Sequence, residues 1–237
     1  MVGELVYEEI IRPEEEVRLA AGLGKADSYR TRDQLIADFL ALEAQHPNWM
    51  SHEIVGQTTQ GRDIYLFKIG NPLGGRVMFS ASHANELCGP EIYYMYAKWL
   101  LENQEPGVSD RILTRNLTLL VPIYNVDSYK SSEDPNNQGT RKNANGVDLN
   151  RNYAATWRTD CTKLGDCVDS TCPSGQQCID GWCYTSGCSC GWSDLTTKWN
   201  YRGPSAASEA ETRVTPLFLA PSPVISILDY HCRAGPY

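Results

Sequence analysis

The sequence of 237 residues lacks the features that mark membrane-spanning and nucleic-acid-binding proteins. No run approaches the roughly 18 to 20 consecutive apolar residues that cross a bilayer, so we expect no membrane span. The formal net charge is −8, and lysine and arginine form no basic run, so a nucleic-acid partner is not expected. The acidic opening, Met1 to Glu9, lacks the charged and apolar regions of a secretory signal peptide.

The composition instead favours one folded domain. Hydrophobic residues make up 41% of the chain and charged residues 21%, which is typical of a protein with a packed core. We expect a domain over residues 29–237 and an N-terminal extension of unknown structure over residues 1–28. The sequence does not indicate an oligomeric state.

Seven of the nine cysteines lie within thirty residues, which predicts an insertion at about residues 161–190. Their spacings are irregular and no Cys-x-x-Cys occurs, so disulfides are favoured over a structural zinc site, which stays the alternative. Disulfides in turn favour an extracellular or periplasmic location. Cys88 and Cys232 lie apart from the others, and the pairing stays open. The seven clustered residues are Cys161, Cys167, Cys172, Cys178, Cys183, Cys188 and Cys190.

Apolar periodicity predicts strands that alternate with helices. Near-continuous apolar strands are typical of an α/β protein, so we expect a mixed sheet with helices on both faces. Helices are predicted from Thr31 to His46, over 91–102 and over 205–219; strands over 51–57, 62–69, 77–80, 117–124 and 224–230; and a long polar loop over 125–160.

Three residues predict a metal site. His83 and Glu86 are three residues apart directly after the strand at 77–80, and His231 directly follows the strand at 224–230. Ligands of open α/β sheets gather beyond the carboxyl ends of the strands. Two imidazoles and a carboxylate suit one Zn²⁺ and leave a fourth position for water. The alternative is that His83 caps a helix and His231 is a core residue.

A second cluster predicts an anion site. Asn150 and Arg151 stand side by side and can hold a carboxylate through two hydrogen bonds. Arg141 lies a few residues earlier and could stabilise a developing oxyanion. The alternative is a polar surface loop.

These motifs together resemble the carboxypeptidase A family of zinc metallocarboxypeptidases, from about Tyr29 to the end of the chain. The resemblance implies a three-layer sandwich with a mixed eight-stranded sheet, and removal of C-terminal residues from peptides or proteins. The motifs that carry it are Gly61-Arg-Asp-Ile-Tyr65, His83-Ala-Asn-Glu86, Asn125-Val-Asp-Ser-Tyr129, Arg141-Lys142, Val147-Asp-Leu-Asn-Arg-Asn-Tyr153, Tyr201-Arg-Gly203 with Ser208-Glu-Ala-Glu211, and Ile227-Leu-Asp-Tyr-His231.

The resemblance also implies a role for each site residue. His83, Glu86 and His231 would hold the zinc ion. Asn150 and Arg151 would bind the terminal carboxylate of the substrate. In the same way, Arg141 would polarise the scissile carbonyl and stabilise its oxyanion, and Asp148 would accept a hydrogen bond that orients the first histidine.

The chain departs from the family at its end, where only six residues follow His231 and none is acidic. In the family, the catalytic glutamate and the specificity pocket lie beyond this histidine. We therefore expect a partial domain, incomplete at the C-terminus, that lacks the general base, is poorly soluble and has weak or no activity. Asn85 stands where the family often has a basic residue, and the cysteine segment is not a general family feature.

Three other functions stay open. A relative of the family could act on acyl-amino acids or cell-wall peptides. A non-catalytic module could bind zinc and peptides without turnover. The cysteine-rich segment could itself be a disulfide-linked binding insert.

Overall fold

The computed structural model describes residues 29–80, 82–103, 107–131, 133, 139–154, 163–168, 171–179, 182–185, 192–219 and 224–231. The extension expected over residues 1–28 lies outside these residues. The main sheet has five strands in the order β1-β2-β4-β3-β8. Their bounds are β1 (Met50–Gln57), β2 (Asp63–Gly70), β3 (Gly75–Ser80), β4 (Asn116–Val121) and β8 (Val224–Asp229).

The sheet is mixed, as the sequence predicted. β2 pairs antiparallel with both β1 and β4, whereas β3 is parallel to β4 and β8. The register pairs Ser80 with Val121 and with Asp229, so these three strands end at the same edge. The chain segments that leave this edge carry the candidate site residues.

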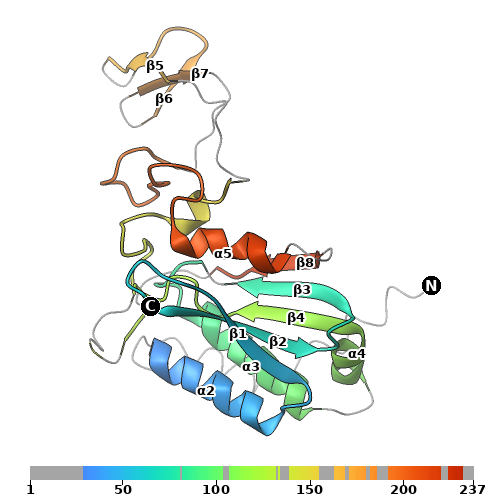
Figure 1. The fold of residues 1–237 in the computed structure, drawn as a ribbon. Coiled ribbons are helices and arrows are strands. Elements are labelled where there is room, and N and C mark those ends of the chain that lie inside the picture. The colour runs from blue at the N-terminus through green and yellow to red at the C-terminus, as the bar shows by residue number, and fades with distance from the viewer. Residues whose placement is uncertain are drawn as a thin grey trace, which may run out of the picture.

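Helices cover both faces of the sheet, which confirms the predicted fold class (Figure 1). On one face, Phe39 of α2 (Arg32–Gln45) stacks on Phe67 with ring centroids 4.8 Å apart. On the other face, a side chain at Gly56 would collide with Val214 of α5 (Ala210–Leu219). Gly56 pairs with Ile64, whose side chain points away from the Phe67 face because successive strand residues alternate.

Two more helices, α3 (Cys88–Glu102) and α4 (Val108–Arg115), pack against each other. The sequence did not predict α4, because only Ser109 and Leu113 of its eight residues are buried and its apolar stripe is short. Within the described residues, no helix combines the length and the apolar composition of a membrane span.

The predicted start of α2 is confirmed by a capping box. The Thr31 hydroxyl accepts a hydrogen bond from the Gln34 amide at 3.3 Å, and the Gln34 side chain accepts one from the Thr31 amide at 2.9 Å. Two amides that the first helical turn leaves without partners are therefore satisfied.

Thr31→Ala is expected to lower the free energy of unfolding by about 1 kcal/mol, because one of these hydrogen bonds is lost. Thr114→Ala is the control, since its exposed hydroxyl donates to backbone carbonyls inside α4, those of Asp110 and Arg111. Urea unfolding followed by circular dichroism measures both variants. Equal stability of the two would contradict the role of the cap.

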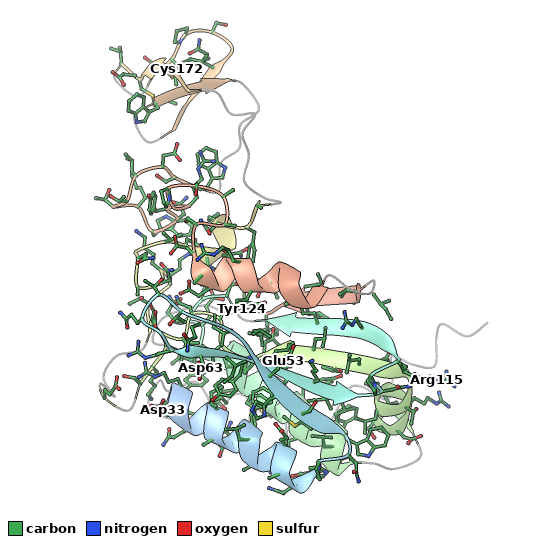
Figure 2. All side chains as sticks on the ribbon, in the orientation of Figure 1. Asp33, Glu53, Asp63, Arg115, Tyr124 and Cys172 are labelled. Atoms are coloured by element: carbon green, nitrogen blue, oxygen red, sulfur yellow. A yellow bond between two sulfur atoms is a disulfide. The ribbon has the colours of Figure 1, made fainter. Side chains whose placement is uncertain are left out.

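The cysteine-rich segment forms a small antiparallel sheet that the sequence did not predict. Its strands are β5 (Lys163–Asp166), β6 (Gln176–Ile179) and β7 (Trp182–Thr185), in the order β5-β7-β6. Two disulfides hold it, Cys167–Cys178 and Cys172–Cys183. Figure 2 labels Cys172, which lies between β5 and β6, and Figure 1 shows the small sheet standing outside the main sheet.

The disulfide prediction is confirmed for these four cysteines. The sulfurs of Cys167, Cys172 and Cys183 lie close enough for a metal, but disulfide sulfurs are not the thiolates that bind zinc. Cys88 is also disulfide-bonded, which excludes a free thiol there. Cys161, Cys188, Cys190 and Cys232 lie outside the described residues.

Candidate metal and carboxylate-binding site

The structure brings His83, Glu86 and His231 together beyond the carboxyl ends of β3 and β8. Their ligand atoms all lie within 4.8 Å of one another. His83 and Glu86 are buried, whereas the His231 side chain is 38% exposed. The site thus has a buried side and a side open to solvent, where a substrate can approach.

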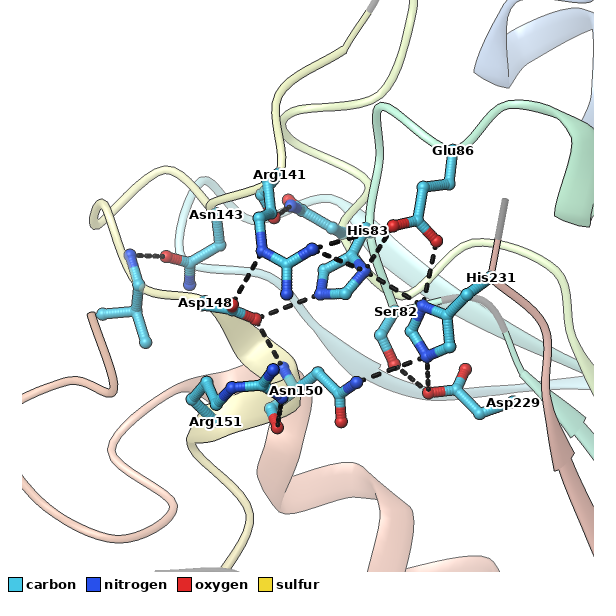
Figure 3. Close-up of polar contacts among 12 residues, drawn as sticks. Ser82, His83, Glu86, Arg141, Asn143, Asp148, Asn150, Arg151, Asp229 and His231 are labelled. Carbon is cyan, nitrogen blue, oxygen red and sulfur yellow. Dashed lines mark hydrogen bonds and ion pairs between the residues drawn. The ribbon is translucent and has the colours of Figure 1, made fainter. Parts of the chain in front are cut away.

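Both imidazoles present Nδ1 to the centre of this group (Figure 3). The two Nδ1 atoms are 3.1 Å apart, and each lies 2.9 Å from one oxygen of Glu86. Two nitrogen ligands of a tetrahedral zinc ion, each about 2.0–2.1 Å from the metal, are separated by about 3.3 Å. The donor types and their spacing therefore fit one zinc ion held by these three residues.

A carboxylate lies behind each imidazole. His83 Nε2 is 3.1 Å from Asp148, which is fully buried, and His231 Nε2 is 3.1 Å from Asp229. The Ser82 hydroxyl donates to the same Asp229 oxygen at 2.8 Å. Each carboxylate favours the tautomer with the proton on Nε2, which leaves the Nδ1 lone pair for a metal.

The sequence suggested Asp148 but not Asp229 or Ser82. Asp229 is the last residue of β8, and a polar residue at the end of a strand does not by itself indicate a function. The signal that could have found it is its position two residues before His231, because strand residues i and i+2 lie on the same face.

The electrostatics of the site favour a cation. Burial alone would raise the pKa of Glu86, but hydrogen bonds from His231 and His83 outweigh it and lower the pKa to about 2. Hydrogen bonds to Asp229 and Glu86 raise the pKa of His231 to about 10. Burial lowers the pKa of His83, yet hydrogen bonds to Asp148 and Glu86 more than offset it and raise the pKa overall. The carboxylates around the imidazoles thus stabilise positive charge at this point, which a bound zinc ion would supply.

The predicted anion-binding residues border the same group. Arg141 Nε donates to Asp148 at 2.8 Å, and Arg141 Nη1 lies 3.7 Å from Glu86. Asn150 Nδ2 lies 3.3 Å from His231 Nε2. Figure 3 shows Arg151 beside Asn150 and farther from the imidazoles.

A short 3-10 turn, Leu149–Arg151, presents Asn150 and Arg151. The buried Asn152 holds this turn, because its side-chain amide donates to the Arg202 carbonyl at 2.8 Å and its oxygen accepts from the Glu209 amide at 3.1 Å. A side chain at Gly203 would collide with Asn152. The Tyr201-Arg-Gly203 and Ser208–Glu211 motifs thus support the turn. This bonding also explains why α5 begins at Ala210 rather than at residue 205, as the sequence predicted.

The fold and the site define an α/β protein with a candidate His-Glu-His metal site at the ends of parallel strands. The model of the family described as zinc carboxypeptidase matches residues 36–234, and the chain belongs to this family. The family resemblance predicted from the motifs is therefore confirmed.

Among curated relatives, human carboxypeptidase O is 32% identical over 123 residues, which cover 46% of this chain and 32% of the relative. Mouse mast cell carboxypeptidase A is 24% identical over 214 residues, which cover 84% of this chain and 43% of the relative. The chain thus spans less than half the length of either relative.

Solved structures show the same fold. Carboxypeptidase A from Helicoverpa armigera aligns with a TM-score of 0.65 and 19% identity, over 93% of this chain and 53% of that one. Bovine thrombin-activatable fibrinolysis inhibitor, in complex with tick carboxypeptidase inhibitor, aligns with a TM-score of 0.64 and 16% identity, over 88% of this chain and 62% of that one.

The contact between Asp229 and His231 leads to a prediction. Asp229→Asn is expected to weaken zinc binding by about 10- to 100-fold, because outer carboxylates orient the metal-binding histidine and make it more basic. Competition with a chromogenic chelator measures the affinity. Asp110→Asn, on the distant helix α4, is the control and should leave it unchanged. Equal affinities of Asp229→Asn and the unmodified protein would contradict the assigned contact.

Proposed function

We propose that this protein is a zinc-dependent metallocarboxypeptidase that acts on the C-terminal peptide bond of peptides or proteins. Family membership supports metallocarboxypeptidase-type activity. The observation that carries the finer proposal is that two Nδ1 atoms and the Glu86 carboxylate converge on one point, with two arginines nearby. A metal and a carboxylate clamp side by side suit hydrolysis next to a free C-terminus.

In this proposal zinc, when bound, supplies a Lewis acid and an activated water. The residues of the chain select and orient the substrate. Arg151 and Asn150 hold the terminal carboxylate, since a guanidinium matches a carboxylate in charge and shape. Arg141, between this clamp and Glu86, faces the scissile carbonyl and stabilises negative charge on its oxygen.

The general base is not one of the three carboxylates that lie against the imidazoles. The carboxylates that contact the two imidazoles are Glu86, Asp148 and Asp229, and each lies 2.9–3.1 Å from an imidazole nitrogen. None of the three is positioned to take a proton from water. A base positioned by another part of the protein would contribute roughly 10²- to 10⁴-fold to the hydrolysis of a hippuryl dipeptide.

The test compares binding of one peptide in two forms, with a free C-terminal carboxylate and with a C-terminal amide. Zinc-loaded protein should bind the acid at least about tenfold more tightly, because only the acid forms charge-assisted bonds with Arg151. Isothermal titration with zinc-loaded and chelator-treated protein measures both affinities. Equal binding of acid and amide would contradict a carboxypeptidase.

A second candidate is a non-catalytic module that binds zinc and peptide C-termini. The engagement of all three site carboxylates with imidazoles favours it. Peptide binding without any hydrolysis after prolonged incubation would support it, whereas slow zinc-dependent release of the terminal residue would support the peptidase. For either candidate, the disulfides support an extracellular or periplasmic location.

A further inference from the structure

The loop that follows the cysteine-rich segment places an exposed tryptophan against the candidate site. The Arg141 guanidinium carbon lies 4.7 Å from the centroid of the Trp199 ring, within the range of a cation–π contact. Trp199 is 61% exposed, although tryptophan is on average a highly buried residue. Core packing therefore does not account for its position.

The loop is tied to the site on both sides of Trp199. The Lys142 ammonium donates to the Thr196 carbonyl at 2.8 Å, and the Asp148 amide donates to the Tyr201 carbonyl at 2.8 Å. Within the loop, the Ser193 amide donates to the Asn200 carbonyl at 3.0 Å. Hydrogen bonds thus fix the backbone of Trp199 to two segments that carry site residues, the 141–142 segment and the 148–151 turn.

Arg141 needs such support from a ring face. Its Nε is held by Asp148 at 2.8 Å, and Nη1 is directed towards Glu86 at 3.7 Å. These contacts are made by N–H groups, whereas the Trp199 ring contributes a separate contact, through its face, with the guanidinium carbon. A ring held against the guanidinium limits its movement and so helps to fix the direction of its N–H groups.

We propose that Trp199 is a positioning residue that holds the Arg141 guanidinium aimed at the oxygen of the scissile carbonyl. This inference rests on the proposed function. The cysteine-rich insertion then has a structural link to catalysis, because the chain returns from it through the loop that carries Trp199. This positioning would act on any peptide substrate, because the carbonyl oxygen of the cleaved bond gains negative charge during hydrolysis.

The experiment uses the zinc-loaded chain and two probes. One is a peptide phosphonate, whose tetrahedral anion imitates the hydrolysis intermediate, and the other is the free amino acid of its terminal residue, which needs only the carboxylate clamp. Trp199→Ala should weaken phosphonate binding about two- to fivefold, the range expected for an exposed cation–π contact. It should leave binding of the amino acid and of zinc unchanged, and Trp199→Phe should restore most of the phosphonate affinity.

Leu73→Ala is the control, because Leu73 is an exposed apolar residue on the turn before β3. An unchanged phosphonate affinity in Trp199→Ala would overturn the inference, as would an equal loss for both probes without recovery in Trp199→Phe. If the unmodified protein binds the phosphonate no better than the amino acid, the proposed function fails and the inference fails with it.

Discussion

Replacing His83 or His231 with alanine is expected to reduce zinc affinity by more than about 100-fold, which exceeds the usual effect of altering an outer hydrogen-bonding partner. Each variant removes one of the two Nδ1 atoms that stand 3.1 Å apart. The remaining imidazole and Glu86 then offer too few ligands for a tetrahedral protein site. Metal content after dialysis and competition with a chelator measure the loss.

His52→Ala is the matched control for these variants. His52 is one of the four histidines of the chain, and its Nδ1 lies 2.6 Å from Glu43, in a pair formed by β1 and α2. It should retain one zinc ion per chain with unchanged affinity. Retention of tight zinc binding by His83→Ala and His231→Ala would refute the metal site, and with it the proposed peptidase chemistry.

The metal trio could be predicted from sequence because strand ends are visible there. The apolar runs 77–80 and 224–230 marked two strands, and His83 and His231 stand just beyond their carboxyl ends. Parallel strands bring their carboxyl ends to one edge, so two residues far apart in the chain meet. Periodicity alone did not reveal that β3 and β8 are neighbours; the family resemblance supported that step.

Other parts of the site could not be predicted, because their signals are weak in the sequence. Asp229 and Ser82 are single polar residues at or just beyond the ends of strands, where polar residues are common. Trp199 lies in a loop with no period to indicate which way it faces. Its contact with Arg141 depends on backbone hydrogen bonds that only the folded loop forms.

The small sheet β5-β7-β6 was missed for a different physical reason. Its strands are only four residues long, too short to show a clear alternation of apolar and polar residues. Two disulfides hold these strands together and compensate for a small hydrophobic core. The cysteine cluster predicted the disulfides. The disulfides stabilise short strands that no pattern of buried apolar residues would have predicted.

The second large effect is expected for Arg151. Arg151→Ala should weaken binding of a peptide with a free C-terminus by about 10- to 100-fold, because charge-assisted hydrogen bonds to the carboxylate are lost. Binding of the amidated peptide should change little, so the preference for acid over amide disappears. Arg151→Lys should recover only part of it, since an ammonium cannot form the two parallel bonds of a guanidinium.

Arg111→Ala controls for the loss of one positive charge, because Arg111 is exposed on α4. Isothermal titration of both peptides to each zinc-loaded variant gives the acid-to-amide ratio. Zinc affinity should stay unchanged throughout, since no nitrogen of Arg151 belongs to the metal group. An acid-to-amide affinity ratio in Arg151→Ala equal to that in Arg111→Ala would show that another group binds the C-terminal carboxylate. It would refute the clamp and leave the metal site intact, because the two functions rest on separate side chains.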